Sequence, residues 1–220
     1  MNLTPVKTPA FVKHILPDYV WNIPTKEKVL YLTFDDGPTP EITTWVLEQL
    51  KAYAAKATFF CIGNNVEKHP DIFQQVLQSG HAIGNHTHNH LKGWKVKTGT
   101  YLENVALAEK VINFQFSNSK FQETEIVNLF RPPYGKLKPK QGKALLEKGY
   151  EIIMWDVLSF DWDQTVSEEN CLKNVLTKSK PGSIIVFHDS MKAAKNMQYA
   201  LPKVLKHFSN AGYTFKVLPC

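Results

Sequence analysis

Residues 29–38 read VLYLTFDDGP, and the fold that we expect for the whole chain starts from this stretch. Its first six residues are apolar, β-branched or aromatic, which is typical of a strand buried on both faces of a sheet. Asp35 and Asp36 follow the strand, and two adjacent carboxylates repel each other unless a cation or an arginine lies close. Gly37 and Pro38 then turn the chain. A helix cap accounts for one of the aspartates but not for the pair.

On both sides of this stretch, short apolar runs alternate with amphipathic segments. The predicted strands cover residues 29–34, 57–62, 82–85, 127–130, 151–155, 183–187 and 213–217, and the predicted helices cover 41–53, 71–78, 101–114, 140–148, 168–177 and 196–209. Strands that alternate with helices form parallel sheets with right-handed crossovers. At 220 residues the chain is short for a complete eightfold barrel of roughly 250. We predict an α/β fold, a distorted and incomplete barrel of about seven parallel strands, with an open doubly wound sheet as the alternative.

A proline-rich segment precedes the first strand. Residues 1–28 contain four prolines, so we predict an irregular N-terminal arm, followed by a single domain over residues 29–220. The arm has no 7-residue apolar run and does not resemble a secretion signal. The sequence by itself therefore indicates the cytoplasm. An export segment removed before residue 1 would leave the same sequence, so the compartment stays open.

Composition excludes several classes of protein. Hydrophobic residues make up 43% and charged residues 21%, an ordinary balance for a globular domain. No apolar stretch approaches the roughly 18 residues that a membrane span needs. The net charge is +6, but no block of five like charges occurs, so we expect no nucleic-acid partner. Three cysteines allow at most one disulfide, and nothing in the sequence predicts a protein partner.

Ionisable side chains follow the ends of five predicted strands. They are Asp35 and Asp36, then His86, His88 and His90, then Arg131, then Asp156 and Asp161, and finally His188 and Asp189. Because the carboxyl ends of parallel barrel strands open on one face, we expect these groups to build a single site at that rim. A role as a loop residue or a helix cap explains any one of them but explains the whole set poorly.

Residues 86–90 read HTHNH, a pattern typical of a metal site. Neutral imidazole is the commonest metal ligand, and closely spaced histidines suit Zn²⁺, Fe²⁺ or Co²⁺. A helical turn would bring His86 and His90 together, whereas an extended strand would place all three histidines on one face. Two imidazoles and one carboxylate leave positions free for water and substrate, as a catalytic metal requires.

Five motifs occur in order: TFDDGP at 33–38, HTHNH at 86–90, RPPYG at 131–135, SFDW at 159–162 and VFH at 186–188. Together they resemble the motifs of the polysaccharide deacetylases of carbohydrate esterase family 4, whose shared unit is the NodB homology domain. The resemblance spans about residues 29–217. It implies a metal-dependent hydrolase of carbohydrate metabolism that removes N-acetyl groups from amino sugars of a polysaccharide or a peptidoglycan- or chitin-type oligomer. Such a substrate belongs to the cell envelope.

The resemblance also implies which residues hold the metal and activate water. Asp36, His86 and His90 would bind a divalent metal, usually zinc, with Co²⁺ or another ion as the alternative. Asp35 would be the general base that deprotonates a metal-bound water. Arg131 would pair with Asp35 and keep its carboxylate charged and oriented.

For the leaving group and the substrate, the resemblance implies a second set of residues. His188 would be the general acid that protonates the leaving amine, and Asp161 would pair with it and raise its pKa. The backbone N–H of Tyr134 would bind the developing oxyanion. Tyr134, Trp162 and Pro133 would contact the glycan substrate.

The sequence departs from the family pattern at Leu158, where many members carry a carboxylate. Either one hydrogen bond near the site is missing, or Asp156 supplies it. His88 is expected to face away from the metal or to bond a loop carbonyl. The lysines around 92–97 and 136–140 lie in loops, where they attract an anionic glycan or remain merely solvated.

Two alternatives to the glycan deacetylase remain open. The same site in a deacylase would act on a small amide or an O-acetyl ester. A catalytically weak glycan-binding module would be expected to lack Asp35 or a metal ligand, and this chain has all of them.

Overall fold

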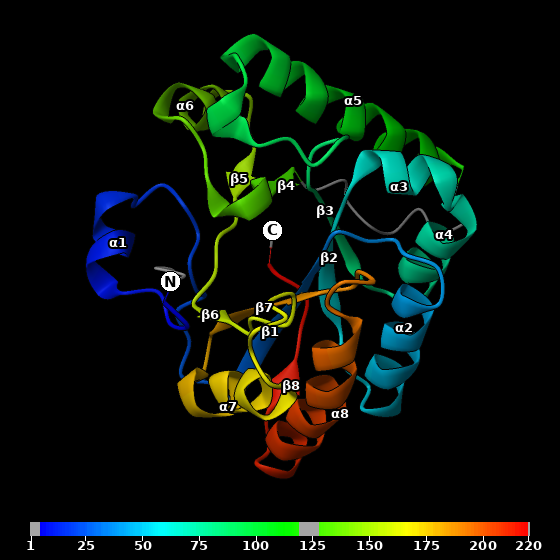
Figure 1. Cartoon of the computed structure of the whole chain (residues 1–220), viewed down its shortest axis with the longest axis vertical. Helices are drawn as coiled ribbons and strands as arrows, with labels where there is room; N and C mark the ends of the chain where they lie inside the picture. The colour runs from blue at the N-terminus through cyan, green and yellow to red at the C-terminus, as the bar shows by residue number, and fades with distance from the viewer. Residues whose placement is uncertain (1–4, 119–127, 220) are drawn as a thin grey trace.

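The centre of the fold is a curled sheet of parallel strands, seen in a computed structural model that describes residues 5–118 and 128–219 (Figure 1). The strands are β1 (Val29–Asp35), β2 (Ala57–Cys61), β3 (Ala82–Asn85), β4 (Leu129–Phe130), β5 (Glu151–Ile152), β6 (Val157–Leu158), β7 (Ile184–His188) and β8 (Thr214–Phe215). They lie in the order β5-β4-β3-β2-β1-β7-β6, with β8 paired to β1. Every one of these pairings is parallel. The predicted incomplete barrel is thus confirmed.

The central strands are buried on both faces, as the run VLYLTF predicted. All seven residues of β1 and all five of β2 are buried. Phe34 of β1 stacks on Phe59 of β2 at 5.1 Å and on Phe187 of β7 at 6.1 Å between ring centroids. Parallel strands need this double burial because their crossover helices cover the sheet. The rigid strands in turn hold the residues at their C-terminal ends in place.

Helices surround the sheet on its outer side (Figure 1). They are α1 (Ala10–Ile15), α2 (Ile42–Ala52), α3 (Gly63–Lys68), α4 (Pro70–Gln78), α5 (Thr98–Ser117), α6 (Pro139–Glu147), α7 (Glu168–Lys178) and α8 (Ala194–Asn210), with short 3₁₀ turns η1 (Gly93–Lys95) and η2 (Pro133–Gly135). Within the described ranges, no helix combines the length and the apolar character needed to cross a lipid bilayer.

Several elements differ from the sequence prediction. Helices α1 and α3, each of six residues, and the two-residue strand β6 were not predicted. They are too short for a periodic pattern to develop, so only tertiary contacts select them. The predicted strand 151–155 is shorter than expected, since β5 ends at Ile152. Residue 127 of the predicted strand 127–130 lies outside the described residues.

The N-terminal arm lies along the opening between β5 and β6, the two ends of the sheet. The N–H of Val20 donates to the carbonyl of Ile152 at 2.9 Å, and Met154 donates back to Val20 at 2.7 Å. Farther along, Leu158 of β6 donates to the carbonyl of Val6 at 2.8 Å. The arm therefore forms hydrogen bonds with backbone N–H and C=O groups at the edges of the sheet. In a complete barrel, another strand would form these bonds. It also contains helix α1, so it is more regular than predicted.

A buried carboxylate ties the arm to the sheet. Asp156, directly before β6, is fully buried and forms ion pairs with Lys7 at 2.9 Å and Lys13 at 2.7 Å. The hydroxyl of Ser183 donates to the same carboxylate at 2.6 Å. Burial raises the pKa of Asp156, but these donors outweigh it and the net pKa is lowered. Asp156 thus has a complete set of partners away from the candidate site.

Candidate active site

The candidate site lies where β1, β3, β4 and β7 end. Asp35 ends β1 and His188 ends β7, and the parallel register pairs these two residues directly. Asn85 ends β3 and pairs with the last residue of β4, so His86 and Arg131 leave the sheet side by side. The N–H of Arg131 donates to the carbonyl of Asn85 at 3.0 Å. Sheet register therefore brings together groups that are up to 153 residues apart in sequence (188 − 35).

Asp36, His86 and His90 form a group that could hold a metal ion, because their ligand atoms all lie within 4.8 Å of one another. Oδ1 of Asp36 is 3.3 Å from Nε2 of His90 and 3.7 Å from Nε2 of His86. This oxygen is buried and has no hydrogen-bond partner among the described residues. A buried carboxylate oxygen without a donor is costly. A cation between it and the two imidazoles would satisfy it, so this donor set fits a divalent transition metal.

The protonation states of these three residues suit metal binding. Nδ1 of His86 lies 2.7 Å from the carbonyl of Arg131, so Nδ1 donates and Nε2 keeps its lone pair toward Asp36. Burial lowers the pKa of His86, and burial together with His86 lowers the pKa of His90 to about 4. Burial raises the pKa of Asp36, but the neighbouring histidines outweigh it and lower the pKa. Neutral imidazoles and an ionised carboxylate are the ligating forms of these groups.

Backbone strain is concentrated at the same place. Asp36, His90 and Tyr134 have positive φ angles of 83°, 52° and 60°. Each such residue costs of order 1–3 kcal/mol when it is not glycine, and it persists only where the surroundings determine it strongly. Strain at three neighbouring positions is consistent with a site in which the placement of side chains matters more than stability.

The loop that carries Asp36 is held by Asp189. The Asp189 carboxylate accepts from the N–H of Gly37 at 3.1 Å and from the hydroxyl of Thr43 at 2.6 Å. A Cβ at position 37 would overlap this carboxylate, which explains the glycine. Burial raises the pKa of Asp189 to about 7, and the charge of Asp36 adds to the rise. Asp189 therefore positions the loop and does not reach the groove.

A buried ion pair holds Asp35. Nη1 of Arg131 donates to Oδ1 of Asp35 at 2.7 Å, and both side chains are almost fully buried. The remaining donors of Arg131 reach the Thr33 hydroxyl at 2.7 Å and the carbonyls of Ile153 and Met154 at 3.1 and 2.9 Å. Burial lowers the pKa of Arg131 and Asp35 opposes this, yet arginine stays protonated in proteins. The pair fixes the orientation of the Asp35 carboxylate.

These contacts also show what happens at Leu158, where many family members carry a carboxylate and where either a hydrogen bond is missing or Asp156 supplies it. The Arg131 guanidinium finds backbone carbonyls and Thr33 instead of a second carboxylate. Asp156 does not supply the missing contact, because its oxygens are taken by Lys7, Lys13 and Ser183. Leu158 itself is one of the residues that line the groove.

His188 is bound twice by one carboxylate. Asp161 accepts from the backbone N–H of His188 at 2.6 Å and from its ring Nδ1 at 2.8 Å. Burial lowers the pKa of His188, but Asp161 and then Asp36 and Asp35 outweigh burial and raise the pKa to about 9. Since Asp161 occupies Nδ1, Nε2 is the ring nitrogen left for a ligand. A pKa raised this far favours the protonated imidazole at neutral pH.

A groove of about 480 Å³ opens above these groups, a volume typical of ligand sites. Tyr134 lies on one wall with its ring 4.7 Å from His90, and Trp162 lies on the other with its ring 4.8 Å from His188. Trp162 also stacks on Phe160 at 5.0 Å. Two aromatic walls on either side of a polar centre suit a sugar ring, whose C–H faces pack on aromatic surfaces.

Most of the predicted site residues meet in this groove, but not all of them line it. Asp35, Asp36, His86, His90, Tyr134, Trp162 and His188 are lining residues. Arg131 and Asp161 are fully buried behind Asp35 and His188, so they act through these neighbours. Pro133 is buried as well, and the lining proline is Pro132.

Several lining residues were missed or given little weight in the sequence. Ser190 and Lys192 follow β7, and their position just after a strand end was the available signal. Trp155, the last residue of the predicted strand 151–155, is only half-buried and lines the groove. His88 turns away from the metal group, with Nε2 3.6 Å from the carboxylate of Glu67. A Cβ at Gly63 would lie 2.7 Å from Nδ1 of His88, so glycine makes room for this ring.

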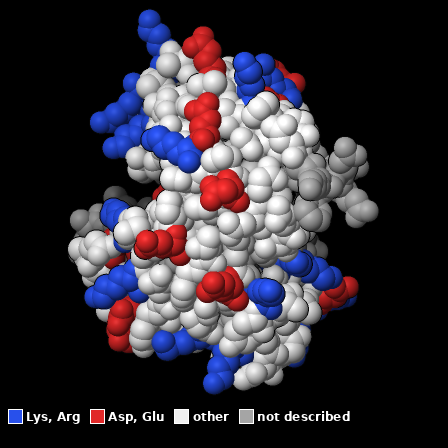
Figure 2. All heavy atoms as spheres, turned by 90° about the vertical axis from the view of Figure 1, so that its right-hand side faces the viewer, with Lys and Arg blue, Asp and Glu red and all other residues white. Residues whose placement is uncertain are grey.

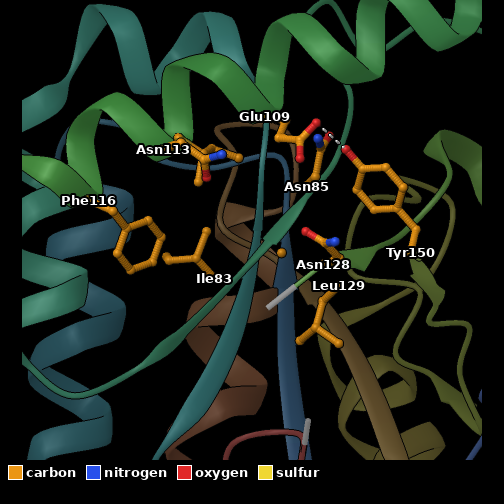
Figure 3. Close-up of a pocket in the computed structure, with 10 residues that line it drawn as sticks. Ile83, Asn85, Glu109, Asn113, Phe116, Asn128, Leu129 and Tyr150 are labelled. Atoms are coloured by element: carbon orange, nitrogen blue, oxygen red, sulfur yellow. Dashed lines mark hydrogen bonds between the residues drawn. The ribbon is translucent and has the colours of Figure 1, made fainter. Parts of the chain in front are cut away.

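A second cavity lies behind the site and is much smaller. Figure 3 shows it between α5 and the strands, with the Tyr150 hydroxyl donating to Glu109 at 2.8 Å. Asn85, the residue before His86, borders it. Its volume of about 20 Å³ suits a single water molecule, which would reach the buried Oδ1 of Asn113 that lacks a partner among the described residues. It is too small for a substrate.

Comparison with known proteins connects this geometry to one family. The family model described as polysaccharide deacetylase matches residues 22–153. A peptidoglycan-N-acetylglucosamine deacetylase of Bacillus cereus is 36% identical over 203 residues, which cover 89% of this chain and 88% of that protein. A chitooligosaccharide deacetylase of Azorhizobium caulinodans is 34% identical over 168 residues, 76% of each chain.

A solved structure shows the same fold. It is the crystal structure of a peptidoglycan N-acetylglucosamine deacetylase in complex with 4-naphthalen-1-yl-N-oxidanyl-benzamide. The TM-score is 0.85 at 33% identity, and the match covers 96% of this chain and 95% of the other. The similarity therefore extends over the strand ends that carry the site.

Proposed function

The chain belongs to the polysaccharide deacetylase family, and from this premise we propose that it hydrolyses the N-acetyl groups of amino sugars in a peptidoglycan- or chitin-type glycan. The observation that carries the proposal is the buried oxygen of Asp36 near two imidazole nitrogens, which has no hydrogen-bond partner in the described part of the chain. It lies in the same groove as a carboxylate held by Arg131 and an imidazole held by Asp161. Relatives named for peptidoglycan and chitooligosaccharide support this substrate class and an action at the cell envelope.

Asp36, His86 and His90 would hold the metal, with Zn²⁺ expected first and Co²⁺ as the alternative. When bound, such an ion lowers the pKa of a water from about 15.7 towards about 7 and polarises the acetyl carbonyl. The carbonyl of Arg131 keeps His86 in the ligating tautomer. One residue thus orients both groups, since the guanidinium of Arg131 orients Asp35 while its backbone carbonyl orients His86.

Two proton transfers complete the hydrolysis. Asp35 accepts a proton from the attacking water, and the guanidinium at 2.7 Å stabilises the carboxylate form that can do so. The new C–O bond forms as the amide carbon becomes tetrahedral. Nε2 of His188 then gives its proton to the amide nitrogen as the C–N bond breaks, which releases acetate and a free amino sugar. Asp161 holds His188 in the protonated form until that step.

The walls of the groove would hold the sugar and the developing charge. The backbone N–H of Tyr134 would donate to the oxyanion, a contact that contributes about 3–4 kcal/mol per donor in such sites. Trp162 would pack on the sugar ring beside His188. Pro133, which begins the turn η2, would act by setting the position of Tyr134 and not by contact.

Acetate release from purified protein tests this function. We expect release from N-acetylglucosamine oligomers and peptidoglycan fragments after Zn²⁺ loading, and loss of release after treatment with a chelator. Restoration by added Zn²⁺ or Co²⁺ checks that the chelator acts through the metal. Turnover confined to small amides or O-acetyl esters would contradict the glycan assignment and support the small-molecule alternative.

Replacing Asp161 by Asn should change the pH profile. With a pKa of about 9, His188 is a protonated acid below that pH, so native kcat/KM should fall as pH rises through this region. A metal ion bound by Asp36, His86 and His90 would repel the positive charge of protonated His188. It would therefore move the alkaline limb of the pH profile to somewhat lower pH. Asn removes the charge that raises this pKa, so the alkaline limb should move further down, towards the ordinary pKa of about 6.5.

The measurement for Asp161→Asn is kcat/KM across a pH series. Glu169→Gln is the matched control, because Glu169 is exposed on α7 and outside the groove. An alkaline limb at the same pH in Asp161→Asn and in native protein would show that His188 is not the acid.

A further inference from the structure

The groove has a positively charged rim. Lys92, Lys136 and Lys192 line it, while Asp35 and Asp36 at its centre are its only acidic residues among the described lining residues. None of the three lysines forms an ion pair with a carboxylate in the described part of the chain. Both central aspartates are already engaged by Arg131 or by the metal group. Three ammonium groups are therefore free to meet an anion.

Two of the lysines are placed over aromatic rings. Nζ of Lys92 lies 5.2 Å from the ring centroid of Tyr134, and Nζ of Lys136 lies 5.5 Å from that of Trp94. The two rings meet edge to face at 5.4 Å. A ring face holds an ammonium group in place without neutralising it. This wall thus combines aromatic surface for a sugar with cations for a charged substituent.

The third lysine lies on the other side of the reacting centre. Lys192 lies between β7 and α8, whereas Lys92 follows β3 and Lys136 follows β4. In the sheet, β7 and the β3–β4 pair lie on opposite sides of β1, which carries Asp35. A glycan laid across the groove would therefore meet a cation on each side of the sugar that reacts.

This arrangement is not a general property of the surface. Figure 2 shows the side of the molecule that carries α2, α3 and α4, where basic and acidic side chains lie interspersed. The net charge of +6 is spread over 26 basic and 20 acidic residues. The groove rim differs, since Asp35 and Asp36 at the centre are the only acidic residues among the described lining residues and no acidic residue lies among the lysines of the rim. Such one-sign clefts concentrate ligands of opposite charge.

We infer that the groove selects an N-acetylated glycan with carboxylates on the sugars beside the one that is deacetylated, in preference to a neutral glycan of the same length. The inference rests on the proposed function and makes Lys92, Lys136 and Lys192 residues that determine specificity. Peptidoglycan amino sugars whose lactyl carboxylates carry no stem peptide have this chemistry, and chitin has none.

The test compares two forms of one substrate. A peptidoglycan glycan fragment with free lactyl carboxylates is assayed beside the same fragment with those carboxylates converted to methyl amides. An exposed ammonium–carboxylate pair changes affinity by roughly 1.4- to 5-fold, so three pairs should favour the acidic form in kcat/KM on the order of tenfold at low salt. The preference should shrink as salt screens the charges.

Matched variants distinguish an effect of the rim lysines from an effect of the total charge of the protein. The triple variant Lys92→Gln, Lys136→Gln, Lys192→Gln should lose the preference, and the corresponding triple arginine variant should retain it. Gln at the exposed positions Lys110, Lys173 and Lys206, outside the groove, changes the net charge equally and should leave the preference intact.

Two results would overturn the inference while leaving the deacetylase intact. One is equal kcat/KM for the acidic and amidated forms in native protein, and the other is a preference that survives the triple Gln change. No acetate from either form, or from N-acetylglucosamine oligomers, would contradict the proposed function itself and the inference with it.

Discussion

Asp35→Asn is expected to lower kcat by about 10²–10⁴-fold, the contribution of a positioned acid or base, while metal stays bound. Asn keeps the oxygen that accepts from Arg131 at 2.7 Å, so the geometry of the pair survives. It removes the lone-pair basicity that takes the proton from water. Asp35 is absent from the group of ligand atoms around Asp36, so its loss should spare the metal.

The measurement combines kcat for acetate release with metal content by mass spectrometry. Thermal unfolding is followed in parallel, because neutralising one partner of a buried ion pair leaves the charge of Arg131 without its counter-ion. Near-native kcat in a folded, metal-loaded Asp35→Asn protein would show that another group is the base. Loss of metal would instead place Asp35 among the ligands.

His86→Ala should lose both metal and turnover. Nε2 of His86 is one of three ligand atoms, and its Nδ1 is fixed by the carbonyl of Arg131 at 2.7 Å. Groups that merely orient a ligand change metal affinity by about 10–100-fold, so loss of the ligand itself should exceed that. We expect less than stoichiometric zinc after purification and no measurable acetate release.

His88→Ala is the matched control for His86→Ala. It removes an imidazole from the same five-residue segment, but one that points toward Glu67 and outside the metal group. Metal content and kcat should stay close to native in this variant. Equal metal loss in both variants would mean that the segment binds metal through its fold and not through His86, and full zinc in His86→Ala would overturn the assignment of ligands.

The chain order of the motifs predicted much of the site. Asp36, His86 and His90 were expected at one rim because they follow strand ends, and the family resemblance implied that these three hold a metal. The structure brings their ligand atoms within 4.8 Å of one another. The same reasoning applies to Asp35 and His188, which the register pairs directly. Their assigned roles in catalysis remain predictions that the variants above test.

Other features could not be predicted from the sequence. The strand β6 has two residues and is selected by its parallel pairing with β7. The two lysines that form ion pairs with Asp156 come from the arm, about 150 residues away, and no local pattern connects them to Asp156. The lysines on the groove rim were indistinguishable from solvated loop lysines until their neighbours were known.

The features that the sequence predicted and those that it did not predict differ in the range, along the chain, of the interactions that produce them. Strand burial and turn chemistry are local, since they depend on neighbours within a few positions along the chain, and the amino-acid order determines them. The arm that covers the sheet opening, the tautomer of His86 and the cations around the groove depend on groups far apart in sequence. These interactions contribute energy only once the sheet has brought the groups into contact, so only the folded structure determines these three features.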